Sequence, residues 1–372
     1  MNEASLSETL ANRKNPKIAI AEQGYFRKLE LTDHEKVLIL SSPSHNKSGT
    51  ISKLLQEIAP RTTKTICNIL PNPTETSIKR TIAESQPETW DTLIALGGGS
   101  VIDTAKIVSM FVGRRRADKE INLRHPKDQF ESARACRLIT VPTTAGTGSE
   151  VTQFATIWDD LILEKYSVSS HHLLPDLAIL DSSLLEFLPP KIALYSCLDA
   201  TAHCMETLWN KNRTKESIYF AQNGLKLIEK EIAAFSTNAW NIHVAGKLQR
   251  AALCGGLAIS VSRTAISHSI SYPLTAHLGI PHGLAVGFTL VAIYESLKDA
   301  ELSYVEAEFP MERIVSQLKM LNLAHEIESY AKRPQILNLI DKMSSSERAS
   351  NFILPVSNDL IASILERSLT SE

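Results

Sequence analysis

Four residues of metal-binding types lie in the second half of the chain. Asp199 and His203 are four residues apart in LDATAHCMETLW, so on a helix both side chains project from one face with Cβ atoms roughly 6 Å apart. His268 lies in a later helical stretch, and His282 follows in Pro281-His282-Gly283, which predicts a helix start. One carboxylate and three imidazoles suit a divalent transition metal such as Fe²⁺ or Zn²⁺.

An ion pair within one helix is the alternative explanation for Asp199 and His203. The segment around the two later histidines is apolar, and an imidazole in such surroundings needs a ligand or a hydrogen bond. This favours a catalytic metal. Tyr272, one turn after His268, could reach the same cavity. His277 is either a structural histidine or a contact for the substrate.

A second candidate site lies in the first half, where the strand-like run Thr92–Leu96 ends in Gly97-Gly98-Gly99-Ser100 and a helix is expected over Val101–Phe111. Glycines allow a ligand to approach the backbone closely, and the free N–H groups of a helix start bind anions such as pyrophosphate. We expect Ser100 to be the N-cap and Asp103 to act as a capping-box acid in this cofactor loop. A tight turn with no ligand is the alternative.

A second polar loop, Thr143 to Ser149, follows the strand-like run Arg137–Val141. Loops after parallel strands gather at the carboxyl edge of the sheet, so the two loops together favour a nucleotide. The string is neither GxGxxG, because Ile102 replaces the third glycine, nor a P-loop, because no GK[ST] follows.

The elements that carry these loops alternate between strand and helix up to Pro189-Pro190, which indicates parallel pairing. Further strands are expected at Lys36–Ser41, Thr65–Leu70 and Leu177–Leu180, and helices at Gly49–Ile58 and Thr76–Glu84. Beyond the double proline only helical spacing is found, and helices are expected at Ile192–Trp209, Ile218–Phe235, Ala245–Ser260, Thr264–His277, Met311–Leu321 and Leu360–Leu369. We therefore expect an α/β dinucleotide-binding domain over residues 1–189 and an all-helical metal-binding domain over residues 190–372.

Composition limits the partners of this chain of 372 residues. Thirty-nine Lys and Arg against 41 Asp and Glu leave a formal charge of −2, which gives no electrostatic basis for binding nucleic acid or a membrane surface. Five cysteines at irregular spacing are typical of a reduced, cytoplasmic protein. We expect no signal peptide in MNEASLSETLANRK and no membrane span.

Five motifs in order resemble the iron-containing (group III) alcohol dehydrogenases, which have a dehydroquinate synthase-like fold. They are PNPT (71–74), GGGSVIDTAK (97–106), PTTAGTGSEVT (142–152), LDATAHCMET (198–207) and HSISYPLTAHLGIPHG (268–283). The resemblance implies an enzyme that uses a nicotinamide cofactor and a metal. It implies four metal ligands, Asp199, His203, His268 and His282. It also implies the pyrophosphate loop Gly98, Gly99 and Ser100, and further cofactor contacts at Asn72, Thr143, Thr144, Thr147 and Lys165, to which we add Ser42, Asp103 and Ser149.

The chain departs from the family pattern at two positions. Many NAD-preferring members carry an aspartate after the first strand, where this chain has Leu40-Ser41-Ser42, so NADPH is not excluded and the cofactor is written NAD(P)H. Several members have a second histidine one turn after the third ligand, where this chain has Tyr272. A proton relay would then use Tyr272, His277, the cofactor ribose or water.

Within the family, Glu206–Ser217 and Ser267–Ala285 most resemble the phosphonoacetaldehyde reductases. The resemblance implies reduction of a small aldehyde, phosphonoacetaldehyde, to 2-hydroxyethylphosphonate, and we expect a homodimer. Arg263, Lys211, Arg213 and His277 are the local candidates for binding a phosphonate. The alternatives are a reductase of lactaldehyde, a semialdehyde or a simple aldehyde, a metal-free maleylacetate reductase type, a dehydroquinate-synthase-like lyase, and a non-catalytic nucleotide-binding paralogue.

Overall fold

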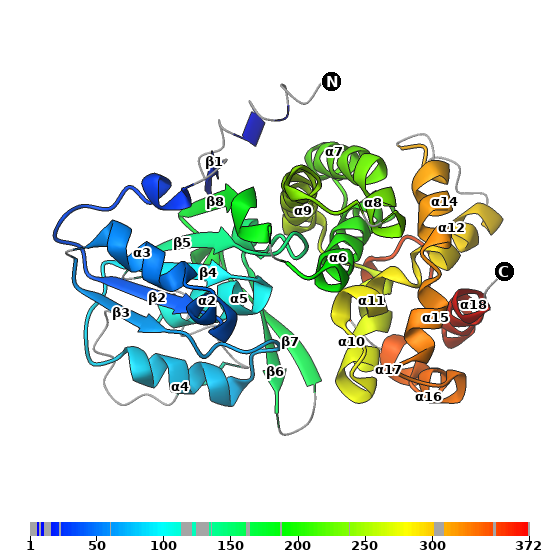
Figure 1. Cartoon of the computed structure of the whole chain (residues 1–372). Helices are drawn as coiled ribbons and strands as arrows, with labels where there is room; N and C mark the ends of the chain where they lie inside the picture. The colour runs from blue at the N-terminus through cyan, green and yellow to red at the C-terminus, as the bar shows by residue number, and fades with distance from the viewer. Residues whose placement is uncertain are drawn as a thin grey trace. The chain divides into compact units, whose positions relative to one another are not determined.

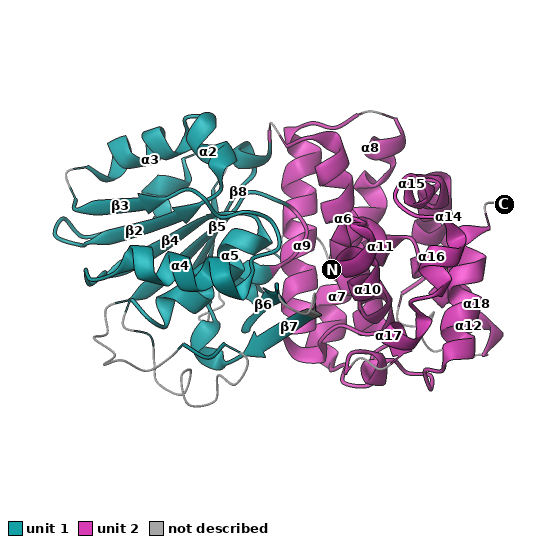
Figure 2. Ribbon diagram, turned by 90° about the horizontal axis from the view of Figure 1, so that it is seen from below, with its two compact units in different colours: residues 1–144, 149–185 teal, residues 145–148, 186–372 magenta. Residues whose placement is uncertain are grey.

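The chain forms two compact units (Figure 2). Unit 1 comprises residues 1–144 and 149–185, and unit 2 comprises residues 145–148 and 186–372. The division falls four residues before the expected one at Pro189-Pro190, and the short segment 145–148 joins the second unit. The computed structural model describes residues 6, 9–10, 16–21, 24–59, 61–112, 121–123, 134, 136–160, 164–186, 188–237, 239–300, 309–344 and 347–370.

Unit 1 is built on a six-stranded sheet in which all described pairings are parallel (Figure 1). The strand order is β1-β8-β5-β4-β2-β3. The strands are β1 (Lys17–Ala21), β2 (Val37–Ser41), β3 (Thr63–Ile66), β4 (Thr92–Gly97), β5 (Arg137–Pro142) and β8 (Leu177–Asp181). The α/β architecture expected from the sequence is confirmed.

Helices cover both faces of this sheet, which is why its central strands are apolar throughout. Leu38 and Leu40 of β2 pack into one core cluster with residues of α4 and α5, whereas Val37 and Ile39 pack into another with residues of α3. The helices of unit 1 are α2 (Pro43–Lys47), α3 (Thr50–Ile58), α4 (Glu75–Ser85) and α5 (Gly99–Ser109). A capping box between Thr74 and Ser77 fixes the start of α4.

Three strands of unit 1 were not predicted from the sequence. β1 pairs with β8, and β6 (Phe154–Asp159) forms an antiparallel hairpin with β7 (Glu164–Ser169). Buried and partly buried residues are mixed along β1 and β6, so these strands lack the continuous apolar run of the central ones. β3 ends at Ile66, four residues before the expected Leu70.

Unit 2 is helical, and among the described residues it holds no strand beyond a single bridge between Asn210 and Phe352. Its helices are α6 (Pro190–Leu208), α7 (Lys215–Glu231), α8 (Ala233–Ser236), α9 (Ile242–Ser262), α10 (Ile266–Leu278), α11 (His282–Gly287), α12 (Leu290–Asp299), α14 (Glu312–Met320), α15 (Leu323–Glu328), α16 (Arg333–Leu337), α17 (Ile340–Ser344) and α18 (Asn358–Leu369). The helix expected over Ile218–Phe235 is divided between α7 and α8. In the described parts of the chain, no helix combines the length and apolarity needed to cross a bilayer.

Small residues bring α6, α7 and α9 close together. A Cβ atom on Gly224 of α7 would lie 2.5 Å from Sγ of Cys204 on α6, and one on Gly255 of α9 would lie 3.1 Å from Cβ of His203. Side chains at either position would push the helices apart. The backbone of α6 that carries two predicted metal ligands is therefore held tightly from two sides.

Candidate metal centre and nucleotide-binding loops

Three helices of unit 2 bring the four predicted metal ligands around one carboxylate oxygen. Oδ1 of Asp199 lies 3.5 Å from Nε2 of His203, on the same helix α6, and 3.4 Å from Nε2 of His268 on α10. Nε2 of His282, the first residue of α11, lies 3.8 Å from the same oxygen. An ion pair between Asp199 and His203 within α6 would involve only one imidazole. It therefore does not explain why three imidazole nitrogens lie around this one carboxylate oxygen.

Three buried atoms of the predicted ligands lack hydrogen-bond partners, Oδ1 of Asp199, Nδ1 of His203 and Nε2 of His268, and the first and last of them test whether a metal fits. Oδ1 of Asp199 and Nε2 of His268 make no hydrogen bond, and their residues are only 5% and 2% exposed. The ligand atoms of Asp199, His268 and His282 all lie within 4.8 Å of one another, whereas His203 lies outside this group although its Nε2 is 3.5 Å from Oδ1 of Asp199. Unsatisfied buried polar atoms are costly, and a divalent cation among them would satisfy each one. The residues present therefore fit Fe²⁺ or Zn²⁺.

The electrostatics favour the metal-binding forms of Asp199 and His203, whereas at His268 the carboxylates of Glu206 and Asp199 outweigh burial and raise the pKa, so a cation would have to displace a proton there. Burial opposes ionisation of Asp199, but the imidazoles of His203, His268 and His282 outweigh it and hold the pKa of the carboxyl well below its usual range. Burial also lowers the pKa of His203 to about 4, so this imidazole is neutral at pH 7. Metal ligation requires an ionised carboxylate and neutral imidazoles.

Glu206, which the sequence reasoning missed, positions His268. Its carboxylate, fully buried on α6, accepts hydrogen bonds from the backbone N–H of Ala265 (2.8 Å) and Ser267 (2.6 Å) and from Nδ1–H of His268 (2.7 Å). A proton held on Nδ1 leaves the Nε2 lone pair directed at Asp199. The sequence carried one signal that could have identified Glu206. It lies two helical turns after Asp199 in the same motif, so on a helix both side chains project from the same face.

His282 is positioned by a hydroxyl and by a glycine. Oγ of Ser271 donates to the carbonyl of His268 at 2.9 Å and lies 3.4 Å from Nδ1 of His282, so it can accept the Nδ1 proton and leave Nε2 free to bind. A Cβ atom on Gly283 would lie 1.9 Å from the carbonyl oxygen of Tyr195 on α6. Only glycine allows the start of α11 to approach α6 this closely.

The two predicted catalytic residues lie in different places. The ring of Tyr272 lies 6.3 Å from that of His268 and 5.8 Å from that of His282, so it borders the ligand cluster as expected. His277 is exposed and accepts a hydrogen bond of 3.1 Å from Nζ of Lys342. Nine residues along a helix correspond to about 13 Å and half a turn, so His277 faces away from His268. The expectation that His277 contacts the substrate is not supported by this placement.

The basic residues singled out from the sequence make contacts elsewhere. Nζ of Lys211 donates to the carbonyl of Ser350 at 3.1 Å, and Nη1 of Arg213 donates to the carbonyl of Asn210 at 3.5 Å. Arg263 lies 3.5 Å from the exposed carboxylate of Glu347. The basic residue beside Tyr272 is instead Arg348, which no motif indicated. Its guanidinium carbon lies 5.3 Å from the centroid of the Tyr272 ring.

In unit 1 the glycine-rich turn opens α5 as expected, but with a different cap. Gly98, not Ser100, is the N-cap, and α5 begins at Gly99. A Cβ atom on Gly98 would lie 3.2 Å from the side chain of Thr144, which shows how closely the two loops approach. Oγ of Ser100 accepts the backbone N–H of Asn72 at 3.2 Å. The structure thus brings Asn72, Gly98, Ser100 and Thr144 together at the carboxyl ends of neighbouring strands.

Asp103 and Ser149 belong to a network with Lys106, another residue that the sequence reasoning missed. Asp103 is two residues too far along α5 to be a capping-box acid, and it accepts from Oγ of Ser149 (2.5 Å) and from the backbone N–H of Thr156 (2.9 Å). Nζ of the fully buried Lys106 donates to Ser149 Oγ at 2.8 Å and to the carbonyl of Phe154 at 2.6 Å. These contacts fasten the second loop and β6 to α5.

The remaining predicted cofactor residues are distributed over three places. Ser42 is the N-cap of α2, where its Oγ lies 2.7 Å from that of Ser44. Oγ1 of Thr143 lies 3.0 Å from Nε2 of His45, a histidine on α2 that no motif predicted. Lys165 lies on β7, with Nζ 5.8 Å from the ring centroid of Trp158. Thr147 lies in the segment that belongs to unit 2.

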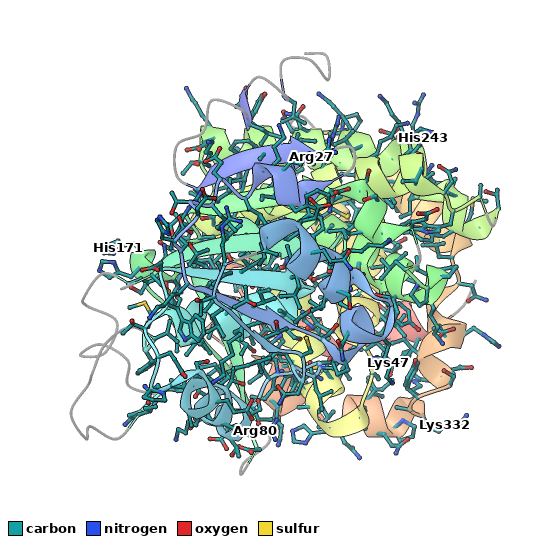
Figure 3. All side chains as sticks on the ribbon, turned by 60° about the vertical axis from the view of Figure 1, so that its left-hand side comes forward. Arg27, Lys47, Arg80, His171, His243 and Lys332 are labelled. Atoms are coloured by element: carbon teal, nitrogen blue, oxygen red, sulfur yellow. The ribbon has the colours of Figure 1, made fainter. Side chains whose placement is uncertain are left out.

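The adjacent histidines His171 and His172 are not part of either site. Their rings contact each other, with 3.7 Å between centroids, and His171 is exposed. Figure 3 shows His171 pointing outward from the ribbon.

Known proteins resemble the chain in sequence and in fold. It is 35% identical over 204 residues to the phosphonoacetaldehyde reductase of Streptomyces viridochromogenes, a match that covers 54% of this chain and about half (51%) of that curated relative. An iron-containing alcohol dehydrogenase from Thermococcus thioreducens superimposes with a TM-score of 0.84 at 22% identity, covering 97% of this chain and 100% of that one. A sulfoacetaldehyde reductase from Bifidobacterium kashiwanohense, solved in complex with NAD⁺, superimposes with a TM-score of 0.80 at 21% identity, covering 96% and 98%.

Two family models divide most of the sequence between them. Residues 16–182 match the model for iron-containing alcohol dehydrogenase, and residues 193–352 match the model for the C-terminal part of the same family. The second match contains all four residues of the metal cluster and Glu206. The chain belongs to the iron-containing alcohol dehydrogenase family, whose members are oxidoreductases that act on alcohols and aldehydes.

Proposed function

We propose that this protein is a metal-dependent, NAD(P)H-linked reductase of small aldehydes, with phosphonoacetaldehyde as substrate and 2-hydroxyethylphosphonate as product. The observation that carries the proposal is the convergence of three imidazole Nε2 atoms on Oδ1 of Asp199, with that oxygen and Nε2 of His268 both lacking a hydrogen-bond partner. The choice of substrate rests on the identity with the Streptomyces viridochromogenes reductase.

The reaction adds a hydride to the carbonyl carbon and a proton to the resulting alkoxide oxygen. When bound, the metal supplies Lewis acidity toward the carbonyl oxygen and the nicotinamide supplies the hydride. Asp199, His203, His268 and His282 would hold the cation, and Glu206 would keep the proton of His268 on Nδ1. Burial raises the pKa of Tyr272, so its hydroxyl, which is hydrogen-bonded with Thr264, remains protonated at neutral pH and is our candidate for the proton donor.

The two loops of unit 1 are proposed to bind the cofactor. The backbone N–H groups at the start of α5 would face a pyrophosphate, with the hydroxyls of Ser100, Thr143 and Thr144 beside them. Residue 42 is a serine, so no carboxylate there repels the 2′-phosphate of NADPH. We therefore propose that NADPH is used at least as well as NADH.

An NADPH-oxidation screen of the purified protein tests the function. The substrates are phosphonoacetaldehyde, sulfoacetaldehyde, lactaldehyde, succinic semialdehyde and propionaldehyde, each with added Fe²⁺, Zn²⁺ or EDTA. We expect metal-dependent oxidation that is fastest with phosphonoacetaldehyde. A decisive preference for a neutral aldehyde would refute the substrate but keep the activity. Full activity in EDTA with no bound metal would favour the maleylacetate reductase type, and turnover without net nicotinamide oxidation would favour the lyase.

A homodimer and a cytoplasmic location complete the proposal. The five cysteines are all free thiols, in keeping with a reducing compartment. Light scattering of the purified protein and fractionation of the cells that produce it test these two points directly.

A further inference from the structure

The side chain of His45 crosses the carboxyl edge of the sheet in unit 1. His45 lies on α2, shortly after β2, and its Nε2 lies 3.0 Å from Oγ1 of Thr143, the residue that follows β5. Between these two strands lies β4, which pairs with β2 on one side and with β5 on the other. Strands in a sheet are about 4.8 Å apart, so β2 and β5 are separated by about 10 Å. The contact therefore spans the end of β4, where the glycine-rich turn begins at Gly97.

The strands β2 and β4 mark a switch point in this sheet. From β2 the chain runs through α3 to β3 at one edge, and from β4 it runs through α5 to β5 on the other side. Ile51 and Leu54 of α3 belong to one core cluster, whereas Val101 and Ile102 of α5 belong to the other, so the two helices cover opposite faces. Open parallel sheets bind ligands outside the carboxyl ends of the strands at such a point. The contact between His45 and Thr143 lies at this place.

The groups at the glycine-rich turn suit an anion but supply little charge. The first N–H groups of α5 have no acceptor within the helix, and they form the positive end of its dipole. The side chains of Ser100 and Thr144, which lie at the same turn, are neutral hydroxyls. Lys106, further along α5, is fully buried, and its Nζ already donates to three oxygens at 2.6 to 3.0 Å. His45 therefore brings to this turn a side chain that can become positively charged.

His45 is neutral in the free protein, and an anion beside it would change that. Burial lowers the pKa of His45, so its imidazole is uncharged at pH 7. The charged side chains of α2 and of α3, the helix that packs against α2, are those of Lys47, Lys53 and Glu57, and all three are exposed. A negative charge within about 4 to 6 Å favours the protonated form of a histidine. A phosphate placed at the turn would thus raise the pKa of His45.

We propose that His45 binds the pyrophosphate of the nicotinamide cofactor and takes up a proton when the cofactor binds. This inference rests on the proposed function, because that function requires a dinucleotide at the loops of unit 1. One ring N–H of His45 would donate to a phosphate oxygen, while the other ring nitrogen stays on Thr143 and the first N–H groups of α5 bind the same pyrophosphate. The proton comes from the solvent, and the resulting hydrogen bond between imidazolium and phosphate is charge-assisted.

Isothermal titration calorimetry of the full chain tests the inference without turnover. The ligands are ADP-ribose, which carries the pyrophosphate, and adenosine, which carries no phosphate. Each is titrated into the wild type and into His45→Gln at about pH 6 and pH 8. Loss of a charge-assisted hydrogen bond predicts that His45→Gln binds ADP-ribose about 10- to 100-fold more weakly at the lower pH, with a smaller change at the higher pH. Adenosine affinity should stay within about twofold.

Proton uptake is measured by repeating the ADP-ribose titration in two buffers that differ in ionisation enthalpy. The pyrophosphate of ADP-ribose is a diester, so its own charge does not change over this pH range. We expect the wild type to take up a fraction of a proton near neutral pH and His45→Gln to take up measurably less.

His34→Gln is the matched control. His34 is exposed and precedes β2, so it lies at the amino edge of the same sheet. Its ADP-ribose affinity and proton uptake should equal those of the wild type. Thermal melting of each variant separates loss of the phosphate contact from loss of the fold, and the amide in His45→Gln can still form a hydrogen bond with Thr143.

Three results would overturn the inference. The first is an ADP-ribose affinity of His45→Gln within about twofold of the wild type at both pH values. The second is an equal loss of ADP-ribose and adenosine affinity, which would give His45 a purely structural role. The third is a loss for NADPH with none for NADH, which would place the imidazole at the 2′-phosphate instead.

The same measurements separate this inference from the proposed function. If the wild type binds ADP-ribose through His45 but oxidises NADPH with none of the aldehydes, the proposed function fails and the phosphate contact stands. If the wild type reduces an aldehyde with NADPH and His45→Gln binds ADP-ribose as the wild type does, the inference fails and the proposed function stands.

Discussion

Glu206→Gln is the sharpest test of how the metal centre is assembled. All the groups around the Glu206 carboxylate are donors, namely three backbone N–H groups and Nδ1–H of His268, at 2.6 to 3.3 Å. A glutamine keeps the shape but replaces one acceptor oxygen with an NH₂ group. If the amide oxygen stays on Ser267, the NH₂ faces Nδ1 of His268. The imidazole then moves its proton to Nε2, the atom that must bind the metal.

The expected size of the effect follows from these contacts. Changing the partner that orients a metal-binding histidine typically lowers metal affinity 10- to 100-fold, which corresponds to about 1.4 to 2.7 kcal/mol. A buried donor left without an acceptor adds about 1 to 3 kcal/mol of destabilisation to the folded chain. Metal binding should therefore weaken more than a small loss of thermal stability alone would explain.

Equilibrium dialysis with Zn²⁺, against a chelator of known affinity, measures the change directly. The matched control is Glu231→Gln on α7, where Oε1 accepts from Lys247 at 2.6 Å and touches no metal ligand in the described structure. Zn²⁺ affinity in Glu206→Gln within about twofold of wild type would refute the argument. Equal weakening in both variants would show a general effect of destabilisation.

Three further predictions concern the ligands, the cofactor and pH. His268→Ala should reduce metal-dependent turnover below about 1% while NADPH affinity, measured by fluorescence titration, changes little, because His268 lies in the metal cluster and not in the loops of unit 1. Ser42→Asp should shift the NADPH:NADH ratio of kcat/KM by about tenfold or more toward NADH, because a carboxylate repels the 2′-phosphate; an unchanged ratio would place the ribose elsewhere. Burial raises the pKa of Glu150 to about 7, so the folded state binds more protons than the unfolded state from about pH 4.5 to 7, and stability falls as pH rises through this range. Glu150→Gln should remove about 3 kcal/mol of that fall, seen as a smaller drop in Tm between about pH 5 and pH 8, and an identical drop in both proteins would contradict the assignment.

The sequence predicted the central strands and the proximity of Asp199 and His203 because both have local signatures, whereas His268 and His282 were assigned as metal ligands through the resemblance to the family. Central strands of a sheet covered on both faces are short continuous apolar runs, and Asp199 and His203 lie one helical turn apart. β1 and the β6–β7 hairpin were missed because their partly buried strands lack that signature.

The residues that support the sites were harder to predict, since their partners are distant in sequence. Glu206 bonds to His268, 62 positions away, and Lys106 bonds to Ser149, 43 positions away. Arg348 and Thr264 are separated by 84 positions. Such pairs have no periodic pattern, and only the packing of helices and strands reveals them. The spacing of Glu206 on α6 indicated its face but not its partner.

The segment 145–148 limits how this protein can be divided. A Cβ atom on Gly146 would lie 2.8 Å from the backbone of Ser196, and one on Gly148 would lie 2.3 Å from the Cα of Gly256, so the segment packs on α6 and α9 although its neighbours in sequence belong to unit 1. In a chain truncated at residue 185, these two glycines would lack α6 and α9, the helices on which they pack. An exchange of the second half between relatives would therefore have to carry residues 145–148 together with α6 and α9, although that segment lies within the first half of the sequence.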